Sequence, residues 1–202
     1  PGVFDSWAHF KRAMDKPVWK ELHEKMAKEK GVTILKWVCQ PGDWFLFTDK
    51  GPVESMADLK DQKIRIAGGE AFSRTVKAMG ATPVSLPYTE VVTSLQTNMI
   101  DGVLTDMNAG TYYYKLPRYT KYLVPISFTI QPICIVVSTE WYQSLDPKAR
   151  QAFTDVFDRI NVQDFYSGMQ KKLIEQWREK EELAVMDLSD AEKERWRQKM
   201  FE

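Results

Sequence analysis

The pattern of apolar and polar positions over residues 63–106 predicts strands and helices that follow one another in turn. Short apolar runs such as KIRIA have the length of strands, and the segments between them repeat apolar residues at helical spacing. A first helix should end at Gly80, and a second should begin at a Thr89 cap. A strand–helix–strand–helix–strand order is typical of a parallel layer in an α/β protein.

The flanking regions are predicted to be largely helical, with a few strands. Residues 4–30 show a helical pattern that Pro17 divides in two, and a strand follows over residues 32–39. Residues 122–138 predict one long strand or two short ones, because prolines interrupt the apolar run. The helical pattern after Asp146 continues for roughly 30 residues or more, which is longer than one small domain usually needs.

The composition indicates a globular protein with balanced charge. Apolar residues make up 44% of the chain and aromatic residues 12%, while 28 basic residues balance 28 acidic ones. A net charge of zero gives no reason to expect a nucleic-acid partner or an anionic membrane surface. The longest apolar run, residues 133–137, is far shorter than the roughly 20 residues of a transmembrane helix, so we do not expect the protein to span a membrane.

The two cysteines, Cys39 and Cys134, both lie in apolar, strand-like segments. Their spacing is too wide for a metal knuckle or a redox pair. We interpret them as buried free thiols, and a disulfide stays open if the two strands are neighbours.

No sequence motif predicts catalysis, a cofactor or a metal site. The two histidines, His9 and His23, lie in the N-terminal helical region, and the sequence contains no nucleophile elbow, HExxH, Walker or GxGxxG motif. Gly68 and Gly69 follow a strand and could bind an anion at a helix N-terminus, although a tight turn is the simpler interpretation. We therefore expect a protein that is not an enzyme. A helix-mediated interaction module, or a small-acid enzyme on the same frame, is the alternative.

Arg65 is the charged residue whose position needs an explanation. Its neighbours Ile64 and Ile66 point to the opposite face of a short strand. Burial of an unpaired guanidinium is heavily penalised. Three interpretations follow: an edge strand with Arg65 in water, a structural ion pair, or a clamp for a ligand carboxylate, which a guanidinium binds through two parallel hydrogen bonds.

Residues 58–102 resemble the signature of the substrate-binding proteins of TRAP transporters, the DctP-type family. The matching motifs keep their order and spacing, and they are Asp58-Leu59-Lys60, Lys63-Ile64-Arg65, Ala78-Met79-Gly80-Ala81, Pro83, Tyr88-Thr89-Glu90-Val91, Leu95-Gln96-Thr97 and Ile100-Asp101-Gly102. The resemblance implies an α/β fold of the periplasmic-binding-protein type II kind, with two lobes, mixed sheets and a long helix that spans both lobes. It also implies a periplasmic receptor that binds a small organic acid and delivers it to the membrane subunits of a TRAP transporter, with no cofactor.

The resemblance assigns ligand-binding roles to particular residues. Arg65 would form the principal salt bridge to the ligand carboxylate, Tyr88 would pack on the ligand, and the backbone near Gly69 would line the pocket. Thr105, followed by Asp106, stands where sialic-acid-type members often have Asn, which argues against sialic acid.

Three further positions complete the expected substrate site. Phe45 replaces a second arginine of some members, and Trp44 lies beside it, which implies an apolar pocket wall and favours a monocarboxylate. Gln131 is the polar residue of the returning strand. No metal ligand set is predicted, and whether a cation bridges the ligand stays open.

The resemblance also predicts the division of the chain. Residues 1–42 should hold the remainder of lobe one and the first crossover, and residues 43–130 should form lobe two. Residues 131–202 should supply the return crossover strand, the spanning helix and a C-terminal helix. Members of the family carry a further part of lobe one before this region, so we expect the chain to be a C-terminal fragment.

Overall fold

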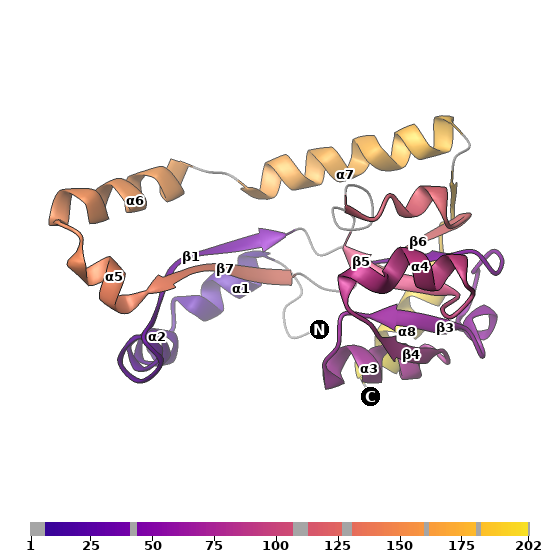
Figure 1. The fold of residues 1–202 in the computed structure, drawn as a ribbon, viewed down its shortest axis with the longest axis horizontal. Coiled ribbons are helices and arrows are strands. Elements are labelled where there is room, and N and C mark those ends of the chain that lie inside the picture. Colours follow the sequence, from indigo (N-terminus) through magenta and orange to yellow (C-terminus); the bar gives the residue numbers. More distant parts are fainter. Residues whose placement is uncertain are drawn as a thin grey trace. The chain divides into compact units, whose positions relative to one another are not determined.

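The computed structural model describes residues 7–40, 44–106, 113–126, 131–159, 162–180 and 183–201. The chain forms two compact units, each built from two separate parts of the sequence (Figure 1). The first unit comprises Pro1–Gly42 and Thr129–Met169, and the second comprises Asp43–Phe128 and Gln170–Glu202. The region 131–202 is therefore divided between the two units.

The first unit contains helices around a two-stranded antiparallel sheet. Its elements are α1 (Trp7–Met14), α2 (Pro17–Lys30), β1 (Val32–Gln40), β7 (Gln131–Ser138), α5 (Thr139–Ser144), α6 (Pro147–Arg159) and the first part of α7 (Val162–Glu179). Pro17 opens α2, where its missing N–H costs nothing, and Gly31 ends the helix with a φ of 64°. The predicted division of the N-terminal helical region at Pro17 is thus confirmed.

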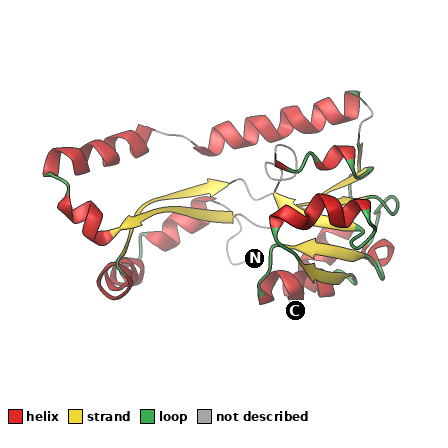
Figure 2. Ribbon diagram, viewed as in Figure 1, coloured by secondary structure: helices red, strands yellow, loops and turns green. Residues whose placement is uncertain are grey.

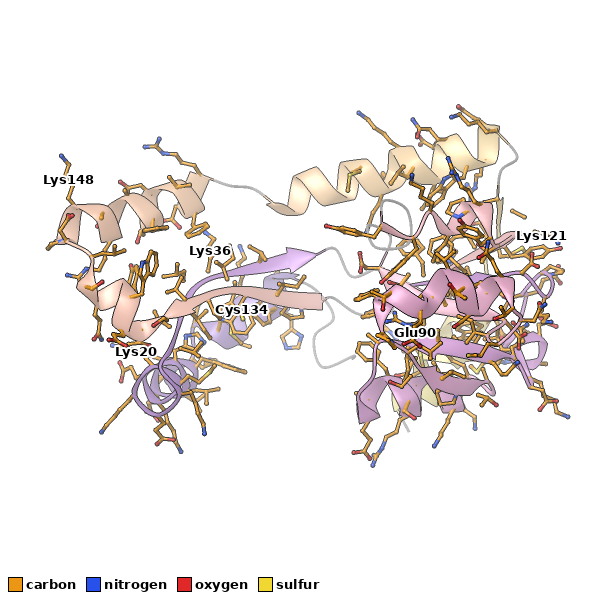
Figure 3. The ribbon with its side chains drawn as sticks, in the orientation of Figure 1. Lys20, Lys36, Glu90, Lys121, Cys134 and Lys148 are labelled. Carbon is orange, nitrogen blue, oxygen red and sulfur yellow. The ribbon has the colours of Figure 1, made fainter. Side chains whose placement is uncertain are left out.

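The two cysteine-bearing strands, β1 and β7, are hydrogen-bonded neighbours. Trp37 lies opposite Cys134, and Cys39 lies opposite Pro132, so the two cysteines occupy diagonal rather than opposite positions. Lys36 and Cys134 mark these strands in Figure 3. The Cys134 thiol is free. The Cys39 side chain lies outside the described part of the structure.

The second unit is built on a six-stranded mixed sheet with the order β4-β3-β5-β2-β6-β8. The strands are β2 (Trp44–Thr48), β3 (Lys63–Ile66), β4 (Thr82–Ser85), β5 (Gly102–Asp106), β6 (Tyr122–Ile126) and β8 (Ala184–Val185). β3 pairs in parallel with both β4 and β5, which confirms the predicted parallel layer. β2 is antiparallel to β5 and β6, so the sheet as a whole is mixed.

Helices cover both faces of this sheet, so its strands alternate between two hydrophobic clusters (Figure 2). One cluster joins the sheet to α3 (Glu70–Ala78) and α8 (Asp190–Phe201) through Val76 and Trp196. The other joins it to α4 (Val91–Gln96) and the end of α7 through Leu95 and Trp177. Both tryptophans are buried core residues. The burial of Trp177 does not favour the interaction-module alternative, in which the long helix would present a docking surface.

Two predicted helices differ in detail from the structure. A one-turn 3-10 helix, η2 (Tyr88–Glu90), precedes α4, so the Thr89 cap is wrong: Thr89 lies inside η2 and α4 begins only at Val91. The helix predicted after Asp146 falls on α6 and α7, and residues 160–161 between them lie outside the described ranges. No helix in the described ranges combines the length and the apolar character needed to cross a lipid bilayer.

A carboxylate organises the turn that leads into β3. Asp58 closes the short 3-10 helix η1 (Met56–Leu59) by accepting hydrogen bonds from the N–H groups of Glu54 and Ser55 and from the Ser55 hydroxyl. The Ser55 N–H in particular favours the ionised form, so the pKa of Asp58 lies below its ordinary value of 3.8, although burial opposes this shift. Leu59, fully buried, anchors the same turn in the core.

We expect Asp58→Ala to lower the free energy of unfolding by about 1 kcal/mol at neutral pH, as the loss of a helix cap does. A lowered pKa in the folded state stabilises the protein above the unfolded value of 3.8, and this stabilisation is lost as the pH falls through the folded pKa. Urea unfolding at pH 7 and at about pH 2.5 should therefore show a difference between variant and wild type that shrinks in acid. An equal difference at both pH values would show that the carboxylate charge has no part in the effect.

Candidate functional site

Arg65 lies on β3, which is an interior strand between β4 and β5. Its side chain is only 1% exposed, so the interpretation of an edge strand with Arg65 in water is wrong. Its partners in the ladder, Val84 and Val103, both belong to the α4-side cluster, while Ile64 and Ile66 belong to the α3-side cluster. The guanidinium is therefore buried on the α4 side of the sheet.

A single backbone carbonyl holds one edge of this guanidinium. Nε and Nη2 of Arg65 both donate to the Leu86 oxygen, at 3.0 and 2.8 Å. Nη1 is buried and has no hydrogen-bond partner within the described part of the chain. None of the ion pairs found in the described ranges involves Arg65, which leaves a structural ion pair without support there. The edge formed by Nη1 and Nη2 is thus the part of the guanidinium that can take a second, bidentate partner.

Two tyrosines stack beside the guanidinium. The Arg65 Cζ lies 4.5 Å from the centre of the Tyr88 ring, which is a cation–π distance. The Tyr114 ring stacks on Tyr88 at 5.0 Å between centres, with 19° between the planes. Tyr88 belongs to η2, whose last residue, Glu90, is labelled in Figure 3.

The electrostatic environment keeps the buried tyrosine neutral. Burial raises the pKa of the Tyr114 hydroxyl well above its ordinary value of 10.0, and the neighbouring Tyr88 and Asp106 raise it further, while the Arg65 guanidinium opposes them. Tyr114 is therefore a neutral, polar group at physiological pH, and Arg65 supplies the positive charge.

The remaining predicted site residues of the second unit lie on both faces of the sheet. Thr105, 2% exposed, is two residues beyond the Arg65 partner Val103 on β5 and lies opposite Phe45 on β2, which puts both on the Arg65 face. Trp44 faces the other way and packs on Phe72 of α3, with ring centres 4.6 Å apart. The structure therefore does not bring Trp44 and Phe45 together as one wall.

Three predicted positions complete this account. Gly69 precedes α3 with a φ of 91°, and Gly68 has a φ of 109°, so both satisfy the turn interpretation of this pair. Asp106 ends β5 and acts electrostatically on Tyr114. Gln131 opens β7 in the first unit, and its side chain lies outside the described residues. Its predicted contact with a ligand stays a prediction.

Comparison with known proteins decides the family. The family model described as bacterial extracellular solute-binding protein, family 7 (DctP) matches residues 1–202. The chain belongs to this solute-binding family. Members of family 7 are substrate-binding receptors of extracellular or periplasmic type rather than enzymes. The α/β fold with mixed sheets and the DctP resemblance are thereby confirmed.

Individual relatives of family 7 are distant but match most of the chain. The C4-dicarboxylate-binding protein DctB of Bacillus subtilis is 21% identical over 99% of this chain and 57% of its own length. The 2,3-diketo-L-gulonate-binding periplasmic protein YiaO of Escherichia coli is 28% identical over 75% of this chain and 45% of its own. The chain thus spans about half the length of these relatives.

A solved structure gives the same fold. The TRAP periplasmic solute-binding protein of Pseudomonas aeruginosa with bound L-malate superposes with a TM-score of 0.84, at 20% identity, over 99% of this chain and 69% of that one. At this identity the likeness establishes the fold alone.

The sequence analysis missed two groups of the site. The Leu86 carbonyl is a backbone atom, which no side-chain pattern can reveal. Tyr114 is the last of three consecutive tyrosines, and nothing in such a run distinguishes the buried ring from its neighbours; Tyr113 is 83% exposed.

Proposed function

We propose that this protein is a periplasmic receptor that binds a small organic acid through Arg65 and delivers it to the membrane subunits of a TRAP-type transporter. In this proposal the second unit is the lobe that carries the clamp, and the first unit is the remainder of lobe one with the crossovers. The protein acts as a receptor, and no catalytic step is assigned to it.

One observation carries the proposal. A guanidinium that is 1% exposed keeps one nitrogen, Nη1, without a hydrogen-bond partner in the described ranges. An unsatisfied buried donor costs about 1–3 kcal/mol, and more when it is charged. Native proteins retain such a cost at functional sites, and a carboxylate is the partner whose geometry matches the free edge.

The site narrows the class of ligand that we propose. The sheet face around Arg65 carries the apolar residues Phe45 and Val103 beside the buried Thr105. Tyr88 covers one face of the guanidinium. These neighbours suit an acid whose carboxylate meets Arg65 and whose remaining part is apolar or planar. A monocarboxylate such as a 2-oxo or aromatic acid is therefore proposed ahead of the sugar acids. Relatives that bind dicarboxylates make that class the alternative.

We expect thermal melting against a panel of acids to identify the ligand class. The panel contains 2-oxo acids, aromatic acids, C4-dicarboxylates including L-malate, and sugar acids. At a hundred times its Kd, a ligand adds about 2.7 kcal/mol of stability, which raises the Tm by roughly 5–10 °C for a chain of this size.

Two variants test whether the thermal shift depends on Arg65. Arg65→Lys keeps a charge but loses the planar fork, so the shift should disappear. Arg74→Ala is the matched control, because Arg74 is an exposed arginine on α3 that pairs with Glu70. The control should keep the full shift. If no acid of any class changes the Tm, or if Arg65→Lys keeps the shift, the proposal is contradicted.

A further inference from the structure

Tyr88 covers the Arg65 guanidinium from an exposed position. Its side chain is 48% exposed and belongs to a single 3-10 turn, η2, so its own segment supports it weakly. A ring in such a position gains its orientation from the groups that it touches. On one side that group is the guanidinium, whose Cζ lies 4.5 Å from the centre of the ring.

A second contact of Tyr88, the Tyr114 ring, is anchored in the core. Tyr114 is only 8% exposed and belongs to the α4-side cluster with Leu116 and Val91. Lys115, between Tyr114 and Leu116, has a φ of 52°, a backbone conformation that costs energy for a residue with a side chain. This turn directs both of its neighbours into the core.

We propose that Tyr114 is a positioning residue that acts through Tyr88: its buried ring keeps the Tyr88 ring over the Arg65 guanidinium, so that the Nη1 edge stays oriented toward the ligand. Three segments thus meet in one stack, with Arg65 from β3, Tyr88 from η2 and Tyr114 from the segment after β5. Tyr114 need not touch the ligand to influence its affinity. The effect of the stack on ligand affinity rests on the proposed function, whereas the effect of the stack on the orientation of Arg65 does not.

Hydrogen exchange of the Arg65 Nε–H tests this role without any ligand. This proton is buried and donates to the Leu86 oxygen, so its exchange reports how firmly the guanidinium is held. The NMR signal of this proton in the 15N-labelled chain is assigned as the one that is missing from the spectrum of Arg65→Lys. Tyr114→Met replaces the ring by a flexible apolar chain that fills part of its volume, and it removes the stack. An aromatic stack of ordinary strength corresponds to exchange faster by a factor of about 2 to 10.

Matched variants separate positioning from general loosening of the core. Tyr119→Met removes a tyrosine ring that packs on the same cluster but is outside the stack, and it should leave the exchange unchanged. Tyr88→Met should accelerate exchange as Tyr114→Met does, and the double variant should exchange no faster than Tyr88→Met alone. Tyr114→Phe keeps the ring and should match the wild type. If Tyr114→Met does not fold, the comparison of Tyr88→Met with Tyr119→Met still tests whether the stack holds Arg65.

Three results would overturn the proposal. The first is equal acceleration by Tyr119→Met, the second is additive acceleration in the double variant, and the third is acceleration by Tyr114→Phe. The panel of acids gives the second readout, in which Tyr114→Met should weaken binding by the same factor of about 2 to 10. If no acid of the panel binds, the proposed function is contradicted but the role of Tyr114 is not, because the exchange rates test that role separately.

Discussion

Replacing Arg65 by Met should weaken carboxylate binding strongly and leave the free protein about as stable as the wild type. Removal of one partner from a hydrogen-bonded charge pair in a closed site costs about 2–5 kcal/mol or more, so the affinity should fall by a factor of about 30 or more. Calorimetric titration with the acid that gives the largest thermal shift measures this loss.

The expected stability of the same variant follows from two opposing effects. Arg65→Met removes the two hydrogen bonds to the Leu86 oxygen and the contact with Tyr88. It also removes a buried charge whose Nη1 has no partner in the described ranges, and replacing such groups by apolar side chains is often neutral or stabilising. We therefore expect a change of within about 1 kcal/mol in the free energy of unfolding.

Ile64→Ala on the same strand is the control for that measurement. Ile64 is equally buried but purely structural, so its truncation should cost about 2–5 kcal/mol. If Arg65→Met destabilises the free protein as much as Ile64→Ala does, Arg65 is a structural core residue and the clamp loses its main support.

Gly102→Ala should be among the most destabilising single substitutions in the second unit. A Cβ at this position would lie 2.6 Å from the Phe47 carbonyl oxygen, 2.9 Å from Cδ1 of Ile64 and 3.2 Å from Cβ of Thr48. The nearest atom is backbone of the paired strand β2, so the sheet itself must shift. We expect a loss of about 3 kcal/mol, the upper part of the range for overpacked cores, and a fall in Tm of roughly 6–12 °C.

Replacing Gly168 by Ala should have the opposite effect on stability. Gly168 lies in α7, and a Cβ there would meet no atom of the described residues within 4 Å. Gly168→Ala should therefore stabilise the protein, by up to about 1 kcal/mol, because Ala is the better helix former. Scanning calorimetry of both variants gives the comparison. Similar Tm values for Gly102→Ala and the wild type would show that β2 and β5 are less closely packed than the structure indicates.

The order of elements in the second unit could be predicted because local pattern determines it. The periodicity of residues 63–106 gave strands, helices and a parallel layer that the structure contains. The pairing of β5 with β2 could not be predicted, since it joins distant parts of the chain. The Asp101–Gly102 motif was recognised from the sequence, but its reason is spatial: the Asp101 carboxylate accepts from the Lys63 N–H at 2.8 Å, and Gly102 leaves room for β2.

The candidate site was only partly predictable. Arg65 was identified because a charge inside an apolar strand conflicts with its surroundings. Alternation along β2 already implied that Trp44 and Phe45 point to opposite faces, so their separation could have been foreseen. The stack of Tyr114 on Tyr88 joins segments that are 26 positions apart in sequence and depends on backbone geometry at Lys115, for which the sequence offered no signal.

The crystal structure of the complex with the acid that most stabilises the protein is the most direct test of the central claim. The account predicts a ligand carboxylate oxygen within hydrogen-bond distance of Arg65 Nη1, about 2.7–3.2 Å, while Nε and Nη2 stay on the Leu86 oxygen. The account would be contradicted by a complex in which the acid binds elsewhere, or in which Arg65 Nη1 donates to a protein group and not to the acid.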